Sequence, residues 1–251
     1  MDITEKFNND GIIVIPAVLS NELTENLKSE LSSATKFDLE KNGDRFDRGM
    51  IHNCMLHGES LLTLLDHPSL YKYVSILLDK TSIVYAYQSS TLPPKSKNYG
   101  SRVHVDCPRF IKNHISNLGV IFPLDDFTIE NGGTFYLPGS HLIESLPDDD
   151  YFYRHAKQVT CKKGDMIIFN ARLAHAAGEN NTAQGRYALT INFCRSYMRQ
   201  RFDYPRLVPE ELIGQLGDIG KQFLGMNVRV PTSLEEFYLP EELRLYKPNQ
   251  G

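Results

Sequence analysis

The sequence predicts an all-β core, a sandwich or barrel, with helices packed on it from both ends of the chain. From residue 82 onward, short segments rich in β-branched and aromatic residues follow one another. Pro-Gly, Asn-Gly and Lys-Gly-Asp turns separate these segments, which is typical of serial short strands. Before residue 80 and after residue 205, apolar residues recur at helical spacing instead.

The N-terminal part predicts a short helix, a strand and further helices. The run GIIVIPAVLS, residues 11–20, is apolar and contains a proline after its strand-like half, as expected for a buried strand. Ser20 is an N-cap candidate for a helix in which leucines recur at helical spacing, because its hydroxyl can accept a hydrogen bond from a first-turn N–H. Two more helices are expected over residues 61–65 and 71–78, with Pro68 in a first-turn position.

The β region predicts five strands, and two helical segments are expected after them. The strand segments are residues 82–90, 117–126, 133–140, 157–170 and 185–196, and the helical segments are residues 209–225 and 232–243. No internal repeat, low-complexity tract or interdomain linker is present in the sequence. We therefore expect one domain over residues 1–251, with a β core at about 82–200 and helical flanks at 1–80 and 205–251.

Composition narrows the functional class. With 251 residues, the chain can bury the core of such a domain. A net charge of −4 gives no basic field for nucleic acid, so the expected partner is a small molecule. The four cysteines lack CxxC spacing, which favours reduced thiols. The N-terminus does not look like a signal peptide, and no apolar run is long enough to cross a bilayer. These features predict a cytoplasmic protein without a membrane partner and leave the oligomeric state open.

A candidate metal site lies in the β region. His104 and Asp106, within SRVHVDCPRF, are two residues apart, so on an extended segment their side chains project from one face. His175, in NARLAHAAGEN, can supply a third ligand. Two histidines and one carboxylate with open positions are the ligands that non-haem Fe(II) oxygenases use. An isolated His-x-Asp also arises by chance, with a histidine that is merely exposed or hydrogen-bonded.

Arg186 follows His175 in what the sequence presents as a hairpin. If residues 174–188 form that hairpin, His175 and Arg186 lie near the same end of neighbouring strands. A guanidinium there can bind a carboxylate through two parallel hydrogen bonds, and so anchor the far end of a dicarboxylate. The alternative is a structural arginine that pairs with an acid such as Glu179.

The order of these motifs resembles that of a known family. After His-x-Asp come ENGGTFYLPGSH at residues 130–141, then Lys-Gly-Asp at 163–165, then His175 and Arg186. This series is similar to that of the phytanoyl-CoA dioxygenase family of Fe(II)/2-oxoglutarate oxygenases. The motifs occur over roughly residues 82–194, and the flanking helices also look like those of bacterial members.

The resemblance implies a mainly β protein with a double-stranded β-helix, a jelly-roll or cupin-like core. It implies Fe(II) held by the His104, Asp106 and His175 side chains, with 2-oxoglutarate anchored by Arg186. Gln88 and Thr134 resemble residues that contact the co-substrate in relatives, although Gln88 can equally be an outward polar residue and Thr134 can satisfy a turn. Some members carry a serine where this chain has Ala177, so support for Arg186 must come from elsewhere. Ascorbate is a candidate reductant.

The implied activity is hydroxylation of an unactivated C–H bond of a small metabolite, an amino acid or a natural-product intermediate. Dioxygen and 2-oxoglutarate are consumed, and succinate and carbon dioxide are released. Asp106 disfavours halogenation, because related halogenases have a small residue in its place. Desaturation or cyclisation is a variant of the same chemistry. A cupin-like metalloenzyme that does not use 2-oxoglutarate and a non-catalytic binding barrel are the alternatives from other classes.

Further residues are candidates for substrate contact. Arginines near the metal motif and after the last strand can recognise an anionic substrate, with Phe202 and Tyr204 packed over it; the alternative is a solvated basic face. The segment 89–102, polar and proline-punctuated, is expected to be a mobile lid. His52 lies outside any ligand spacing and is expected to be structural. The substrate candidates are Tyr99, Arg102, Arg195 and Arg199.

Overall fold

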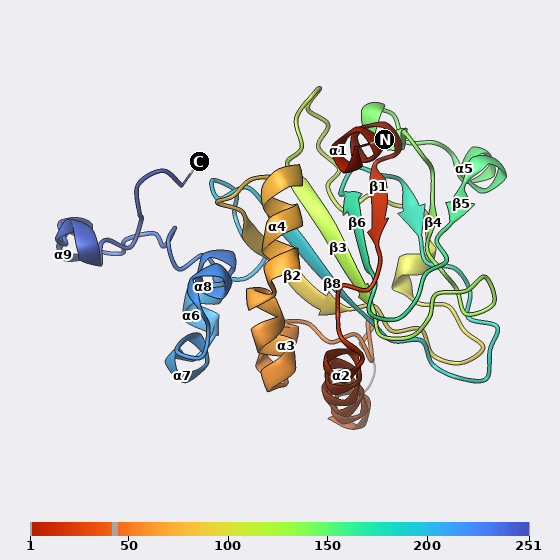
Figure 1. Ribbon diagram of the computed structural model, residues 1–251, viewed down its shortest axis with the longest axis horizontal. Helices are drawn as coiled ribbons and strands as arrows, with labels where there is room; N and C mark the ends of the chain where they lie inside the picture. Colours follow the sequence, from red (N-terminus) through yellow and green to blue (C-terminus); the bar gives the residue numbers. More distant parts are fainter. Residues whose placement is uncertain (1, 42–44, 251) are drawn as a thin grey trace.

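The fold is built on two antiparallel sheets with helices on one side. A computed structural model describes residues 2–41 and 45–250 of the chain, and all statements of structure below concern these residues. Figure 1 shows the large sheet in the middle of the molecule, with helices α3 and α4 lying across it and the small sheet beside it. The sequence-based prediction of a β core with helices from both ends is thereby confirmed.

The large sheet has the strand order β1-β6-β3-β8-β2. All four of its strand pairs are antiparallel, and in the central strands Val120 lies opposite both Ile168 and Ile191. The expected strand at residues 11–20 forms an edge of this sheet rather than standing apart from it. The strands are β1 (Ile12–Ile15), β2 (Ile83–Ser89), β3 (Asn117–Pro123), β6 (Met166–Asn170) and β8 (Ala188–Cys194).

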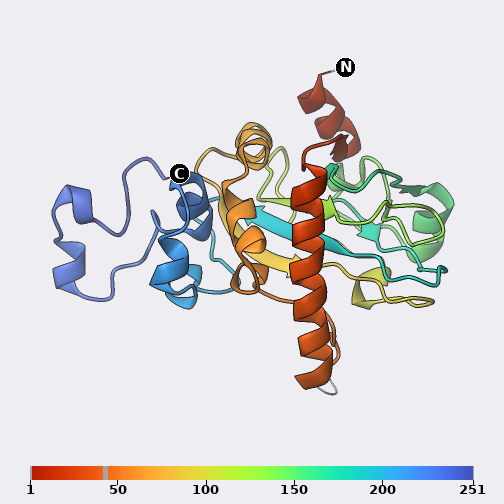
Figure 2. The ribbon, with the colours of Figure 1, turned by 60° about the horizontal axis from the view of Figure 1, so that its bottom comes forward.

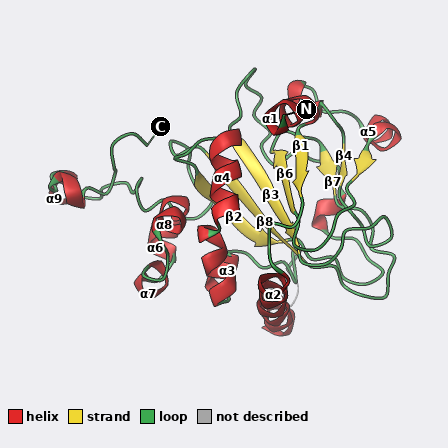
Figure 3. Ribbon diagram, in the orientation of Figure 1, coloured by secondary structure: helices red, strands yellow, loops and turns green. Residues whose placement is uncertain are grey.

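The small sheet has the order β5-β4-β7 and consists of β4 (Phe135–Tyr136), β5 (Lys157–Gln158) and β7 (His175–Ala176). These strands are only two residues long, so much of this side of the molecule is loop, as Figure 3 shows. The hairpin predicted between His175 and Arg186 is wrong, because β7 pairs with β4 in the small sheet whereas β8 pairs with β2 and β3 in the large one. A polar loop that could close a hairpin here connects two sheets instead.

The α- and 3₁₀-helices together account for 35% of the described residues, so the description as mainly β holds for the core and not for the rest. Ser20 caps the longest helix as predicted, since its Oγ accepts a hydrogen bond from the Leu23 N–H at 3.1 Å. Figure 2 shows this helix, α2, running along the side of the molecule. The helices are α1 (Ile3–Asp10), α2 (Asn21–Lys41), α3 (Glu59–Thr63), α4 (Pro68–Leu77), α5 (Asp149–His155), α6 (Tyr204–Leu207), α7 (Glu210–Ile213), α8 (Asp218–Leu224) and α9 (Leu234–Phe237). Among the described residues, no helix combines the length and apolarity needed to cross a bilayer.

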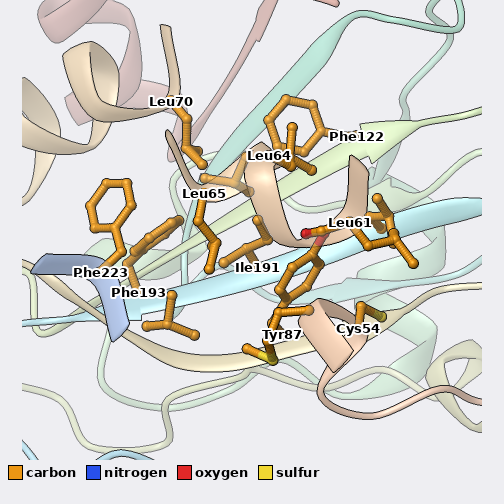
Figure 4. Packing of buried hydrophobic residues seen from close by; sticks show 14 of the residues in the cluster. Cys54, Leu61, Leu64, Leu65, Leu70, Tyr87, Phe122, Ile191, Phe193 and Phe223 are labelled. Carbon is orange, nitrogen blue, oxygen red and sulfur yellow. The ribbon is translucent and has the colours of Figure 1, made fainter. Parts of the chain in front are cut away.

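The main hydrophobic core lies between the large sheet and helices α2, α3, α4 and α8. Alternate residues of β3, Leu118, Val120 and Phe122, point to this side and are fully buried. Figure 4 shows Leu61, Leu64 and Leu65 packed against Tyr87 and Ile191 of the sheet. The Tyr87 hydroxyl donates to the Leu61 backbone carbonyl at 3.0 Å, so this buried polar group is satisfied within the core.

The opposite face of the large sheet carries a smaller apolar cluster and faces the small sheet. Ile121, Ile167 and Phe169 belong to it. Gly119 of β3 lies directly opposite Phe169 of β6, and the Phe169 ring lies over the glycine. A Cβ added at Gly119 would be 2.1 Å from the Phe169 Cζ atom. The absence of a side chain at residue 119 therefore fixes where the Phe169 ring can lie.

We predict that Gly119→Ala lowers the free energy of unfolding by about 1–3 kcal/mol, because the added methyl overpacks the site and displaces the Phe169 ring. Urea unfolding followed by circular dichroism measures the change. Gly185→Ala is the matched control, since its added Cβ would meet its nearest neighbours at 3.6 Å and should change stability by less than about 0.5 kcal/mol. Equal unfolding midpoints for Gly119→Ala and the unmodified protein would contradict the packing argument.

Candidate metal centre

Three side chains from two separate segments converge beside the small sheet. His104 and His175 form an antiparallel backbone bridge, with N–H to O=C hydrogen bonds of 3.0 and 2.9 Å. Asp106 Oδ1 lies 3.6 Å from His104 Nε2 and 3.8 Å from His175 Nε2. The three candidate ligand atoms are all within 4.8 Å of one another. The structure thus brings together the two residues of the His-x-Asp motif and the distant histidine.

Both imidazoles are oriented by the backbone in the same way. The Nδ1 atoms of His104 and His175 lie 2.8 and 2.9 Å from the carbonyl oxygens of Arg102 and Leu173 respectively. A carbonyl can only accept, so each Nδ1 carries a proton, and in a neutral imidazole of this tautomer the lone pair lies on Nε2. Burial, and then the neighbouring His175, lower the pKa of His104 below its ordinary value. The neutral imidazole, which is the form that binds metals, is therefore favoured.

Asp106 is oriented by a side chain that the sequence analysis did not identify. Asn192 Nδ2 donates to Asp106 Oδ2 at 3.1 Å, and Asn117 Nδ2 in turn donates to Asn192 Oδ1 at 3.4 Å. Asp106 Oδ1 thus remains directed toward the two imidazoles. The period of two along β8 could have identified Asn192, because it shares a strand face with Thr190 and is polar among apolar residues.

A cavity of about 410 Å³ opens beside the three residues. The large sheet contributes Ile121, Phe169 and Thr190 to its wall. The Phe169 ring centroid lies 5.0 Å from that of His175, so the wall is apolar next to the candidate ligands. Four other residues predicted for co-substrate or substrate contact line this cavity: Gln88, Tyr99, Arg102 and Thr134.

Arg186 lies behind the cavity wall and does not line it. Its side chain is buried, and its guanidinium donates to the backbone carbonyls of Gly132 at 2.6 Å and Ser90 at 3.2 Å. Among the described residues it forms no ion pair, and its Nε has no hydrogen-bond partner. Burial lowers the pKa of Arg186 to about 10, so the group is still charged at neutral pH. The Asp125 carboxylate attracts the guanidinium without forming an ion pair with it, and the Phe127 ring centroid lies 4.1 Å from the guanidinium carbon, so the buried charge is only partly balanced.

Ser90 lies between Arg186 and the cavity. Its Oγ is 3.5 Å from an Arg186 terminal nitrogen, and it lines the cavity together with Thr134. Because Ala177 cannot donate a hydrogen bond, support for Arg186 had to come from another residue, and Ser90 is placed to give it. Ser90 is two residues beyond Gln88, which was predicted from the family resemblance, so the alternation of an extended segment could have found it. Glu179, the alternative partner of Arg186, instead pairs with Lys97 at 3.4 Å.

The far wall of the cavity carries an acid–imidazole pair. His52 Nε2 lies 2.8 Å from Asp47 Oδ2, and both residues line the cavity. His52 is thus part of the cavity and not only structural, which corrects the expectation drawn from its lack of ligand spacing. Its place follows from a backbone bridge with Gln88, which the sequence does not reveal. The Gln88 Oε1 atom accepts a hydrogen bond from Arg201 at 3.0 Å.

The mouth of the cavity is aromatic and basic. The Arg102 guanidinium lies over the Tyr99 ring, 4.1 Å from its centroid, and also contacts the Tyr99 hydroxyl. Phe46 packs edge-on against Tyr99 with ring centroids 5.5 Å apart. The segment expected to be a mobile lid is bound by backbone bridges from Leu92 to Arg186 and from Ser96 to Asn180. Both ends of the segment line the cavity, Ser89 and Ser90 at one end and residues near Tyr99 at the other.

Two of the substrate candidates lie elsewhere. Arg195 forms an ion pair with Asp79 at 3.1 Å and donates to the Ile115 carbonyl at 2.9 Å, which is the arrangement of a structural arginine. Arg199 lines a second cavity, beyond the end of β8. The sequence could not show that Arg102 lines the metal cavity and that these two arginines do not, because their positions depend on the path of the chain after β8.

Comparison with known proteins identifies the family. The model of the phytanoyl-CoA dioxygenase (PhyH) family matches residues 7–188. Two uncharacterised proteins, of Mycobacterium tuberculosis and Mycobacterium bovis, are each 32% identical to this chain over 208 residues, which is 81% of the chain and 76% of each relative. The dioxygenase FUM3 of Gibberella moniliformis is 26% identical over 118 residues, 47% of this chain and 39% of its own length.

Solved structures show the same fold. ThoJ, a non-haem monooxygenase in complex with nickel, has a TM-score of 0.64 and 23% identity, with 80% of both chains covered. SnoN, an epimerase in complex with Fe³⁺, α-ketoglutarate and nogalamycin RO, has a TM-score of 0.61 and 19% identity, with 76% of this chain and 82% of SnoN covered. The sequence match and the shared fold lead to the same conclusion: this chain belongs to the phytanoyl-CoA dioxygenase (PhyH) family.

Proposed function

We propose that the protein is an Fe(II)- and 2-oxoglutarate-dependent dioxygenase that hydroxylates an unactivated C–H bond of a small metabolite. One observation in two parts carries the proposal. Two imidazoles and a carboxylate lie within 4.8 Å of one another, and the cavity that they line is also lined by Ser90, which lies next to the buried guanidinium of Arg186. The first part suits a metal with open positions, and the second suits the far carboxylate of a dicarboxylate co-substrate. The two sheets would then form the double-stranded β-helix of one domain spanning residues 1–251.

The donor set fits iron. His104 and His175 each offer Nε2, and Asp106 offers one carboxylate oxygen while Asn192 occupies the other. Three protein ligands leave positions open for a keto acid and dioxygen. When bound, the iron would activate dioxygen for insertion into a C–H bond while 2-oxoglutarate becomes succinate and carbon dioxide. The presence of Asp106 as a third ligand favours hydroxylation over halogenation.

The co-substrate would be held at the Arg186 side of the cavity. The guanidinium of Arg186 is fixed by two backbone carbonyls and lacks an acid partner, so an entering carboxylate would balance its charge. Ser90 and Thr134 would donate hydroxyl hydrogen bonds to the same group, because both line the cavity on this side. A cupin-like enzyme that does not use 2-oxoglutarate would leave this buried charge without a role.

The remaining walls would bind the substrate and exclude water. A cavity of about 410 Å³ that must also hold the co-substrate leaves room for a small molecule or for one end of a larger one. Asp47 and His52 offer polar contacts on the far wall, and Arg102 with Tyr99 would cover the mouth. An amino acid or a natural-product intermediate fits this space, and SnoN acts in nogalamycin biosynthesis.

We predict that Asp106→Asn abolishes succinate formation and weakens Fe(II) binding, because the amide keeps the shape of the carboxylate but removes the charge that attracts the metal. Anaerobic titration with Fe(II) and chromatographic assay of succinate, in the presence of 2-oxoglutarate, ascorbate and candidate metabolites, measure both effects. Asp150→Asn on the exposed helix α5 should match the unmodified protein. Full succinate formation by Asp106→Asn, or no Fe(II) uptake by the unmodified protein, would overturn the proposal.

We predict that Arg186→Lys raises the KM for 2-oxoglutarate by about tenfold or more, because a planar pair of donors is replaced by one ammonium group. Arg172→Lys is the matched control: Arg172 is also buried and bound to backbone carbonyls, of Pro108 and Ile143, but neither of these residues lines the cavity, whereas Arg186 contacts the cavity-lining Ser90. Initial rates of succinate formation at varied 2-oxoglutarate give KM and kcat separately. If both variants change KM equally, Arg186 acts only through the fold.

We predict that Asn192→Ala weakens Fe(II) binding by roughly 10- to 100-fold, the usual cost of losing a hydrogen bond that orients a metal ligand. The isolated Asp106 carboxylate would be free to rotate away from the two imidazoles. Anaerobic calorimetric titration measures the affinity, and Asn181→Ala at an exposed position is the control. An unchanged Fe(II) affinity would show that Asn192 does not position Asp106.

A further inference from the structure

A second and larger cavity lies beyond the end of β8. Its volume is about 780 Å³, and we call it the C-terminal cleft. One wall is the segment 196–206, and the other is the C-terminal arm, residues 228–246. Figure 2 shows this arm extending away from the body of the molecule. The arm is closed at its base by a backbone bridge between Val228 and Tyr246 and by a hydrogen bond of 3.1 Å from Arg229 N–H to the Leu245 carbonyl.

The C-terminal cleft is basic although the chain as a whole is acidic. Four guanidinium groups and two carboxylates line the cleft, which leaves a local excess of positive charge, whereas the net charge of the chain is −4. Within the described residues, one of these guanidiniums, that of Arg206, forms an ion pair with a carboxylate, Asp203 at 2.8 Å. The cleft guanidiniums belong to Arg199, Arg201, Arg206 and Arg229, and the carboxylates to Asp203 and Glu236.

The same cleft has an apolar lining. Three of its lining residues are exposed to solvent: Phe202 at 38%, Val230 at 75% and Tyr246 at 47%. Aromatic and aliphatic surface next to unpaired guanidiniums suits a ligand with an apolar body and an anionic group, because the body removes apolar surface from water while the anion accepts charge-assisted hydrogen bonds. Neither a fully apolar nor a purely ionic ligand would use both parts of this lining.

Arg201 connects the C-terminal cleft with the metal cavity. It is the residue shared by the linings of the two cavities. Its guanidinium donates to Gln88 Oε1 at 3.0 Å on the metal side and lies over the Tyr85 ring, 5.4 Å from the centroid. No carboxylate pairs with it among the described residues. Arg201 is thus held by weak contacts at the point where a ligand would pass from one cavity to the other.

We propose that the C-terminal cleft binds the distal, anionic part of an elongated substrate with an apolar body, whose reacting end lies in the metal cavity. The anionic group is a phosphate ester or a carboxylate, bound by Arg199 and Arg229, and Arg201 positions the body between the cavities. This inference rests on the proposed function for the reacting end. Both walls of the cleft lie beyond residue 188, where the match to the family model ends. The match to the family model therefore does not assign the cleft.

The test uses a fluorescent reporter in the metal-free protein. Because the chain has no tryptophan, Tyr246→Trp gives a signal from the C-terminal cleft alone. Tyr151→Trp on α5 is the control reporter, and Figure 1 shows α5 and the arm at opposite ends of the molecule. The quenchers are 4-nitrophenyl phosphate, 4-nitrobenzoate and the neutral 4-nitroanisole. We expect saturable quenching of the cleft reporter by one or both anions, which identifies the preferred anionic group, and none at the control reporter.

Removing the cleft charges should weaken this binding. In the Tyr246→Trp protein, Arg199→Gln combined with Arg229→Gln should raise the apparent Kd by about tenfold or more, as expected for lost charge-assisted hydrogen bonds. Replacing the same two residues by lysine should retain part of the affinity, and Arg154→Gln on α5 should retain all of it. Circular dichroism and Tm values show whether each variant is folded. Equal quenching by 4-nitroanisole, or a Kd unaffected by the double Gln variant, would overturn the proposal.

A longer probe tests the passage between the cavities. An alkyl phosphate with a nitrophenyl group at the far end of its chain should quench a reporter placed at the mouth of the metal cavity by Phe46→Trp. This quenching should be lost in the Arg199→Gln, Arg229→Gln protein. Quenching of the cleft reporter alone would refute a spanning substrate. Because these measurements need neither iron nor 2-oxoglutarate, their failure is independent of the succinate assay that tests the proposed function.

Discussion

The candidate metal centre depends on one pair of backbone hydrogen bonds, those that join His104 and His175 into an antiparallel bridge. A bridge of this kind brings two side chains from distant parts of the chain onto one face, about 5 Å apart. Each imidazole is then turned by the carbonyl two residues before it, so that both Nε2 atoms are available on the same side. Asp106 needs no bridge of its own, because it follows His104 by two residues. The two imidazoles are positioned by main-chain geometry, whereas the Asp106 carboxylate also depends on the Asn192 side chain.

Much of this arrangement was accessible from local sequence patterns, and the rest was not. The spacing of His104 and Asp106 and the Ser20 cap follow from short-range rules and are found in the structure. Each predicted strand segment contains a strand, but the segment 157–170 forms two, β5 and β6, in different sheets. The pairing of strands is a long-range property, and the expected hairpin to Arg186 failed because β7 and β8 pair in different sheets. His52 was missed for the same reason: its place in the cavity comes from a bridge to Gln88. Ser90 lies two residues beyond the predicted Gln88, and Asn192 is a polar residue within an otherwise apolar part of β8, so local alternation could have drawn attention to both.

Net charge was also an incomplete guide. A value of −4 argues against a polyanionic partner, yet it averages over a surface on which acids and bases are separated. Arg195 is neutralised by Asp79, whereas Arg199, Arg201 and Arg229 remain unpaired among the described residues and share one cavity. Their positions along the chain do not distinguish them. The last three arginines differ from Arg195 because the chain after β8 turns away from Asp79 and toward the C-terminal arm. A local anion site therefore exists on an acidic protein.

The two cavities lie in different parts of the molecule and meet at Arg201. The candidate ligands, Arg186 and the small sheet all lie within the part that matches the family model, residues 7–188, and the C-terminal cleft lies outside it. Chemistry that depends on iron and a keto acid restricts the first part, because its ligand geometry must be kept. The second part can vary without disturbing that geometry, provided that it still meets the metal cavity. Arg201 lines both cavities and is hydrogen-bonded to Gln88 in the metal cavity. A different substrate in the cleft would therefore affect the reacting end through Arg201.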